Sequence, residues 1–475
     1  MNPGLALQYA RGYHRRFVSQ LKEFLRFPSV SSQPARTEDS RQCATWLARH
    51  LQQIGLERVR VIPTRGNPIV YASWTNAGKC RPTVLIYGHY DVLPGEPRAG
   101  WQTPPFAPTI KGQDIYARGA ADDKGQLFCH VKAIECWLRG AGKLPVNLKC
   151  LFEGEEEIGS THLLPFVQRN QHTLAADAAV ISDTKMLAPG TPAISYAQRG
   201  GLRAEIEVRG PEQDLHSGTF GGAVLNPLQA LCEIIARLHD DSGRVALPGF
   251  YDDVRDWGND ERAYMARVGP SDGKLLEDGK VEQGWGEPGY SLYERTTIRP
   301  ALTLNGIIGG YNGPGVKGVV PTHATAKLSF RLVPDQDPAG VGKVFREFVA
   351  RVAAEAVRVS TRTFAPVQPA LIDRQHPAVR AAALAYKKGF GAYPVFLRSG
   401  GSIPIVNTVQ KMLGMPAVLM GFGLPDDRIH APNEKFHLPN LYRGIETSIW
   451  YLSIAARVLA HQNRAGQFEE QKAAV

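Results

Sequence analysis

This sequence contains few cysteines, no long apolar run and no block of like charge. The six cysteines of the 475-residue chain are widely spaced without a CxxC pair, a pattern typical of reduced thiols in a cytoplasm. No apolar run reaches membrane-spanning length, and the first residues lack the apolar stretch of a signal peptide. The net charge of +10 comes from scattered basic residues, which does not indicate a nucleic-acid partner. We therefore expect a cytoplasmic protein that binds neither nucleic acid nor membrane.

The pattern of expected elements changes twice along the chain. Helices and short apolar strands alternate over residues 1–197 and again over 373–475, which is typical of an α/β domain with a mainly parallel sheet. Between them, alternating strands and a few helices over residues 198–372 indicate a smaller α+β domain. Residues 248–299, rich in Gly, Asp and Tyr, are not assigned to elements. We predict one discontinuous domain that is interrupted by one inserted domain.

Three apolar runs that we predict as buried strands each end in ligand-type side chains. The runs and the residues that follow them are 83–87 with His89 and Asp91, 147–152 with Glu153–Glu157, and 178–182 with Asp183. Open α/β sheets place their binding sites at the carboxyl ends of their strands. These side chains are therefore expected to meet at one edge of the sheet.

Clustered acids at such positions need neutralisation. Carboxylates repel one another unless protons or cations compensate their charge, and His, Asp and Glu are ligands that suit zinc or manganese. Taken singly, each acid has a structural explanation; Asp122 or Asp123, for example, can cap the helix that follows. Taken together with His89, Asp183 and His430, the set favours a pair of divalent metal ions.

Motifs in a fixed order make a family resemblance specific. The three longest motifs are GHYDVLP at 88–94, RGAADDKG at 118–125 and EGEEEIGS at 153–160, and shorter ones lie at 182–183, 215–218, 330–334, 398–404 and 430–435. The chain resembles carnosinase-type and cytosolic nonspecific dipeptidases. It is similar to the wider two-metal peptidase family that also includes aminoacylase, acetylornithine deacetylase and succinyl-diaminopimelate desuccinylase. The resemblance covers nearly the whole chain.

The resemblance implies a metallopeptidase with two divalent metal ions per subunit. Asp122 would bridge them, with His89 and Asp183 completing one site and Glu157 and His430 completing the other. Zinc is the expected metal, with manganese or cobalt as alternatives. The implied reaction is hydrolysis of an amide bond in a dipeptide or a similarly small amino-acid conjugate.

The resemblance also implies the catalytic groups of the first domain. Glu156 would act as general base on a water that both metal ions activate. Asp91 would hold the tautomer of His89. The family pattern places a non-proline cis peptide between Asp122 and Asp123.

For the inserted domain, residues 198–372, the resemblance implies a lid that also forms a homodimer. His216 would reach the partner subunit's site and stabilise the oxyanion. Arg331, Gly401 and Ser402 match positions that bind the substrate, where a guanidinium suits a carboxylate.

Two departures from the family pattern leave alternatives open. Ser399 stands where many dipeptidases of the family carry an acid for the substrate's free amine, and Gly318 stands where relatives often have a hydroxyl residue. An N-acyl amino-acid amidohydrolase or a carboxypeptidase is therefore the second hypothesis. A non-catalytic metal-binding scaffold is the third, and the presence of Glu156 beside the full ligand set argues against it.

Overall fold

A computed structural model of the chain describes residues 1–95 and 100–473, with side chains as far as residue 460. The chain forms two compact units: the first comprises Met1–Tyr196, Ile372–Phe396 and Ile403–Val475, and the second comprises Ala197–Leu371 and Leu397–Ser402. The boundaries predicted from the sequence put Leu397–Ser402 in the first domain. The structure groups this segment with the second unit, where its main chain bonds to Arg199 and Tyr293.

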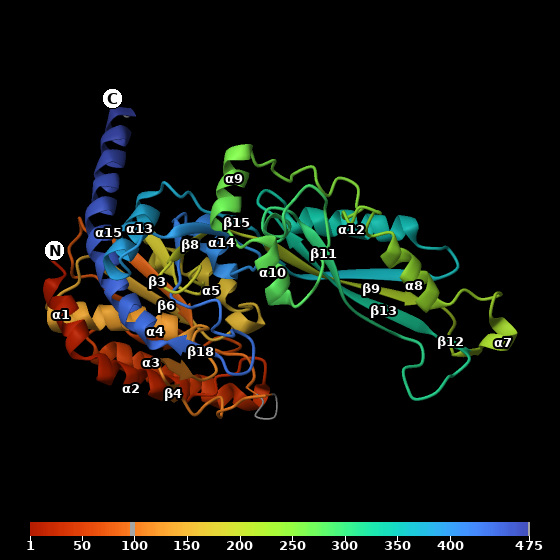
Figure 1. Ribbon diagram of the computed structural model, residues 1–475, viewed down its shortest axis with the longest axis horizontal. Coiled ribbons are helices and arrows are strands. Elements are labelled where there is room, and N and C mark those ends of the chain that lie inside the picture. Colours follow the sequence, from red (N-terminus) through yellow and green to blue (C-terminus); the bar gives the residue numbers. More distant parts are fainter. Residues whose placement is uncertain (96–99, 474–475) are drawn as a thin grey trace. The chain divides into compact units, whose positions relative to one another are not determined.

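The first unit is built on a mixed sheet with a parallel centre (Figure 1). Its strands follow the order β1 (Arg60–Ile62), β2 (Ile69–Trp74), β6 (Asn147–Glu153), β3 (Thr83–His89), β7 (Ala178–Ile181), β17 (Ala417–Met420) and β8 (Ala193–Gln198). The central strand β3 is parallel to β6 and β7, and β17 is parallel to β7, whereas β1, β2 and β8 pair antiparallel. Nearly all positions of the central strands are buried, as is usual for parallel strands covered on both faces. The predicted α/β fold class is confirmed.

Helices and a small second sheet complete the first unit. The helices are α1 (Gly4–Gly12), α2 (His14–Leu25), α3 (Thr37–Gln53), α4 (Lys124–Glu135), α5 (Leu163–Arg169), α6 (Gln171–Leu174), α13 (Pro377–Gly389), α14 (Pro404–Lys411) and α15 (Leu438–Ala473), and the small sheet contains β18 (Lys435–His437), β5 (Asp114–Tyr116) and β4 (Thr109–Lys111). Every residue of α4 is buried, and α4 packs against α15, α2 and β3. The core therefore surrounds the helix that follows Asp123.

The second unit contains a four-stranded antiparallel sheet. Its strands follow the order β11 (Ala301–Gly309), β13 (His323–Leu332), β9 (Gly200–Arg209) and β14 (Arg358–Val367). Helices α8 (Pro227–Ala236) and α12 (Pro338–Val352) pack on it, and the alternate residues of β9 and β13 that face them are buried around Phe330 and Phe345. The edge strand β14 is not predicted by the sequence, because its positions are exposed or only half-buried.

The stretch of the second unit that the sequence leaves unassigned is partly helical and partly irregular. It contains α9 (Asn259–Val268), α10 (Asp272–Gly279) and α11 (Leu292–Arg295). Met265, Tyr293 and Ile298 form a small core of their own, against which Trp257 and Leu275 pack. The stretch is thus held by its own apolar contacts and by the hydrogen bonds between Tyr293 and the main chain of Arg398.

All six cysteines are free thiols, of which Cys80 and Cys232 are exposed. Within the described part of the chain, no helix combines the length and apolar character that a membrane crossing requires.

Candidate metal centre

The five residues predicted as metal ligands lie together in the first unit. His89 ends β3, Asp183 follows β7, and Asp122 lies in the turn before α4. The ligand atoms of His89, Asp122 and Asp183 lie within 4.8 Å of one another, as do those of Asp122, Glu157 and His430. Each group has the composition that could hold a metal ion, and Asp122 belongs to both.

The carboxylate of Asp122 lies between two histidines. Its Oδ1 is 3.0 Å from Nε2 of His89, and its Oδ2 is 2.9 Å from Nε2 of His430. The same His430 nitrogen is 3.3 Å from Oε2 of Glu157. The peptide bond between Asp122 and Asp123 is cis, which confirms the expectation from the family pattern. Of the two Asp122 oxygens, Oδ1 thus faces the group with His89 and Oδ2 faces the group with His430.

The turn that presents Asp122 is held by Glu434, a fully buried acid. Oε1 of Glu434 accepts hydrogen bonds from the main-chain N–H groups of Ala121 and Asp122 at 2.9 and 3.1 Å. Its Oε2 accepts from the N–H of Gly119 and from Nη1 of Arg118, both at 2.9 Å. The sequence contains no separate signal for this role, since Glu434 appears there only as part of the 430–435 motif. Its partners become visible only in the tertiary structure.

Asp91 connects one histidine to the acidic turn. Nδ1 of His89 lies 3.1 Å from the main-chain oxygen of Asp91 and 3.4 Å from its carboxylate. The two carboxylate oxygens of Asp91 accept from the N–H groups of Glu156 and Glu157, each at 3.1 Å. Asp91 therefore contacts the His89 ring, most closely through its main-chain oxygen, and its carboxylate binds the acidic turn.

Two acids of this cluster have raised pKa values, because burial and neighbouring carboxylates disfavour their ionised forms. Burial raises the pKa of Glu156 to about 8; the nearby His89 lowers it, and Asp122 and Asp91 raise it. Burial and the charge of Asp122 likewise raise the pKa of Asp183 well above its usual range. Divalent cations would stabilise the ionised carboxylates. The donor set of histidine nitrogens and carboxylate oxygens therefore fits a pair of such ions.

His216 lies in the second unit. It belongs to β10 (Leu215–His216), which pairs antiparallel with β12 (Val319–Val320). The side chain is exposed, and its Nδ1 accepts a hydrogen bond of 3.1 Å from the N–H of Gly218. The neighbouring Ser217 donates its N–H to the carbonyl of Gly318 at 3.0 Å. The role of His216 stays a prediction.

The residues predicted to bind substrate also belong to the second unit. Arg331 lies on β13 with an exposed side chain. Gly401 donates its N–H to Oγ of Ser399 at 3.1 Å. The hydroxyl of Ser402 donates to the carbonyl of Arg199, a buried residue that the sequence did not mark as functional.

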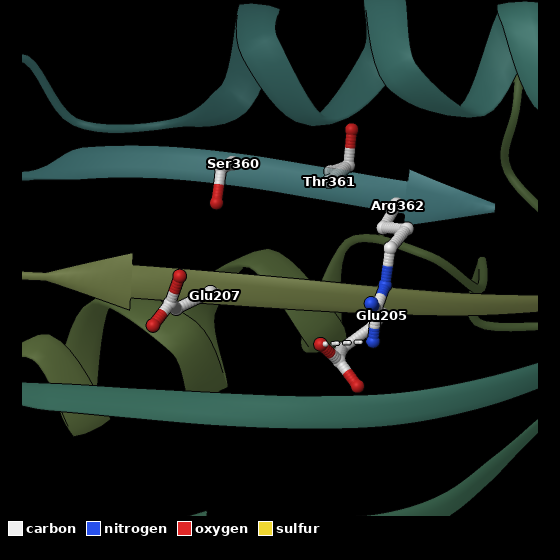
Figure 2. A pocket seen from close by; sticks show the side chains of 5 residues that line it. All are labelled: Glu205, Glu207, Ser360, Thr361 and Arg362. Carbon is white, nitrogen blue, oxygen red and sulfur yellow. Dashed lines mark hydrogen bonds and ion pairs between the residues drawn. The ribbon is translucent and has the colours of Figure 1, made fainter.

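A shallow pocket of about 250 Å³ lies between β9 and β14 of the second unit (Figure 2). Glu205, Glu207, Ser360, Thr361 and Arg362 line it. Nη2 of Arg362 lies 3.3 Å from Oε1 of Glu205. None of the predicted site residues lines this pocket.

Comparison with known proteins places these observations in a family. The model of "Peptidase family M20/M25/M40" matches residues 85–452. The Cys-Gly metallodipeptidase dug1 of Schizosaccharomyces pombe is 31% identical over 465 residues, which are 93% of this chain and 96% of the relative. The human Beta-Ala-His dipeptidase is 31% identical over 457 residues, covering 92% of this chain and 89% of the relative.

A solved structure is similar to both units. The metallo-carboxypeptidase Sso-CP2 from Sulfolobus solfataricus, of the M20 family, has a TM-score of 0.84 and 32% identity. The similarity covers 93% of this chain and 99% of the Sulfolobus chain.

The substitution Glu434→Gln tests how far the turn at Asp122 depends on this one carboxylate. The amide would direct N–H groups at main-chain N–H groups and would leave the guanidinium of Arg118 without its acidic partner. We expect the free energy of unfolding to fall by about 3 kcal/mol, as for other buried pairs that lose one member. We also expect weaker binding of added divalent metal. Urea unfolding and metal analysis after dialysis measure the two effects.

Asp426→Asn is the matched control for Glu434→Gln. Asp426 precedes the same motif and contacts Lys435 at 3.1 Å, but its side chain is 69% exposed. Its replacement should change the unfolding free energy by no more than about 0.5 kcal/mol. Equal stability of both variants would show that Glu434 does not hold the turn.

Proposed function

The chain belongs to peptidase family M20/M25/M40, and on this basis we propose that it is a metal-dependent dipeptidase that hydrolyses the amide bond of dipeptides or similarly small amino-acid conjugates. The observation that carries the proposal is the carboxylate of Asp122, with His89 at one oxygen and His430 at the other. The relatives named as metallodipeptidase and Beta-Ala-His dipeptidase support the substrate class. Family membership makes the chain a metallopeptidase.

We propose two divalent metal ions per subunit, with zinc as the expected metal and manganese or cobalt as alternatives. His89, Asp122 and Asp183 would hold one ion, and Asp122, Glu157 and His430 would hold the other. Bound there, such ions would polarise the scissile carbonyl and lower the pKa of a water molecule.

Glu156 is proposed as the general base. Among the described residues it belongs to neither group of ligand atoms, so its carboxylate is available for proton transfer. Burial raises its pKa to about 8, and bound divalent cations would favour the ionised form that can accept a proton. The main-chain N–H of Glu156 donates a hydrogen bond to the carboxylate of Asp91, which holds the backbone of Glu156 in place. Glu156 would take a proton from the attacking water and pass it to the leaving amine.

For the substrate we propose Arg331, Gly401 and Ser402 as the residues that bind its carboxylate end. A planar guanidinium can bind a carboxylate through two hydrogen bonds, and the side chain of Arg331 is exposed. We further propose a homodimer through the second unit, in which the partner subunit's His216 stabilises the oxyanion. The exposed ring of His216 on a short two-stranded ribbon supports this role.

An N-acyl amino-acid amidohydrolase or a carboxypeptidase is the second candidate function. Ser399 favours it, because a hydroxyl offers a weaker contact to a substrate's charged amine than a carboxylate does. The similarity to the metallo-carboxypeptidase of Sulfolobus points the same way.

We also propose a cytoplasmic location. The free thiols of Cys80 and Cys232 are exposed, and such thiols persist where the redox environment keeps them reduced.

A substrate screen tests the proposed function directly. The purified protein, stripped of metal by a chelator and then supplied with zinc, manganese or cobalt, is assayed with free dipeptides and with N-acyl amino acids. We expect hydrolysis of dipeptides only after metal is restored, because the ions would polarise the scissile carbonyl and lower the pKa of the attacking water. A preference for N-acyl amino acids would select the second candidate. Full activity in the stripped protein would rule out both.

The variant Glu156→Gln tests the base. The amide keeps the shape of the side chain and cannot accept the proton, so we expect turnover to fall about 100-fold or more. The metal content should stay at the wild-type level, because Glu156 is outside both ligand groups. Elemental analysis and kcat are the two measurements. If kcat stayed near the wild-type value, Glu155 or another group would have to be the base.

Subunit complementation tests the role of His216. His216→Ala and Glu156→Gln should each be inactive alone, but a heterodimer of the two contains one site with an intact Glu156 and the partner's His216. After subunit exchange at equal amounts, roughly a quarter of the wild-type activity should return, since half of the dimers carry one complete site. Exchange is verified by mass spectrometry of differently tagged subunits. No recovery after proven exchange would mean that His216 does not act across the dimer.

A further inference from the structure

Residues 257–299 of the second unit, which contain α9, α10 and α11, are called the platform here. They lie against residues 399–402, which are called the substrate loop. We propose that the platform sets the position of the substrate loop through Arg398 and Arg199, and that this determines how tightly the substrate is bound. The inference rests on the proposed function in one respect, namely that Gly401 and Ser402 contact the substrate.

Arg398 is the first anchor, and its side chain does not reach the surface. The side chain is 0% exposed, and its Nη2 and Nε lie 2.8 and 3.2 Å from Oε1 of Glu261 on α9. The guanidinium carbon is 3.7 Å from the centre of the Trp257 ring, within range of a cation–π contact. Removing one member of a buried ion pair is costly. Arg398 is therefore committed to the platform and acts on the loop as a positioning residue.

The main chain of Arg398 is tied to the platform as well. Its N–H donates to the hydroxyl of Tyr293 at 2.8 Å, and that hydroxyl donates to the Arg398 carbonyl at 3.1 Å. Tyr293 is 7% exposed and packs with Met265 and Ile298 in the core of the platform. Both backbone groups next to the substrate loop thus depend on one buried phenol.

Arg199 is the second anchor. Its Nε donates to the carbonyl of Gly400 at 3.3 Å, and its Nη1 donates to the carbonyls of Arg295 and Arg299 at 3.4 and 3.5 Å. The main-chain N–H of Arg199 donates to the carbonyl of Ser399 at 3.2 Å. One guanidinium therefore bridges the substrate loop and the carboxyl end of the platform.

Gly400 brings the two backbones into close approach. A Cβ atom at this position would lie 2.6 Å from the carbonyl oxygen of Thr296, which is main chain and cannot rotate away. The Nη2 atom of Arg199 would be 3.1 Å away. Only glycine lets the loop lie against the platform without a shift.

Arg398 and Arg199 fix the backbone of the substrate loop. Loss of their contacts should therefore weaken the binding of substrate. An interaction that acts equally on the bound substrate and the transition state changes KM and leaves kcat unchanged. Loosening the platform should therefore raise KM, whereas the metal centre and its base should be unaffected.

The experiment compares Glu261→Gln with Asp260→Asn. Glu261→Gln removes the charge that Arg398 requires, and Asp260→Asn makes the same chemical change at the preceding, exposed residue of α9. Hydrogen exchange followed by mass spectrometry reports on the amides of residues 397–403, and steady-state kinetics report on a dipeptide substrate. For Glu261→Gln we expect exchange about tenfold faster and KM raised by about tenfold or more with kcat nearly unchanged. Asp260→Asn should match the wild type.

Two further variants keep the test decisive if Glu261→Gln folds poorly. Glu261→Asp retains the charge and should recover most of the wild-type KM, which a purely structural loss would not show. Gly400→Ala forces the substrate loop away from Thr296. Like Glu261→Gln, it should speed the exchange of the amides of residues 397–403 and raise KM.

The outcomes separate the inference from the proposed function. Unchanged exchange in Glu261→Gln and Gly400→Ala would overturn the role of the platform. Faster exchange with unchanged KM, or a loss confined to kcat, would overturn the link to substrate binding. If the wild type hydrolysed no dipeptide or N-acyl amino acid, faster exchange would still support the platform, and only the proposed function would fail.

Discussion

Burial of the Asp122 carboxylate is the constraint on which the first unit depends. A carboxylate taken out of water is stable only beside charge or hydrogen-bond donors, and His89 and His430 provide these at its two oxygens. Glu434 in turn holds the preceding main chain. Arg118 and backbone N–H groups offset part of its own burial, which still raises its pKa to about 7. The position of the Asp122 side chain therefore depends on a residue more than three hundred positions later in the sequence, Glu434.

The second unit uses buried charge for a different purpose. In the two ligand groups of the first unit, three acids meet two histidines, and such an excess of carboxylates favours divalent cations. In the second unit, Arg398 is compensated by Glu261 and by the ring of Trp257, so that this guanidinium is used for positioning. The same principle thus produces a proposed metal centre in one unit and a fixed loop in the other.

Much of the framework is predictable from the sequence, for identifiable reasons. The central strands read as short apolar runs because parallel strands are buried on both faces, and β3, β6 and β7 lie where those runs are. The edge strand β14 is missed because its positions are exposed or half-buried. The platform is missed because its small core joins Met265, Tyr293 and Ile298, which are too far apart in sequence to produce a helical or strand period.

By itself, the sequence determined the α/β class, the family and the residues that arrive at the strand ends, because these depend on local periodicity and on motifs of adjacent residues. Only the tertiary structure decided which partners compensate buried charge. Glu434 meets Ala121 and Arg398 meets Glu261 across more than a hundred residues of chain. Such pairs leave no local pattern, since the free energy of burying a charge depends on what surrounds it after folding.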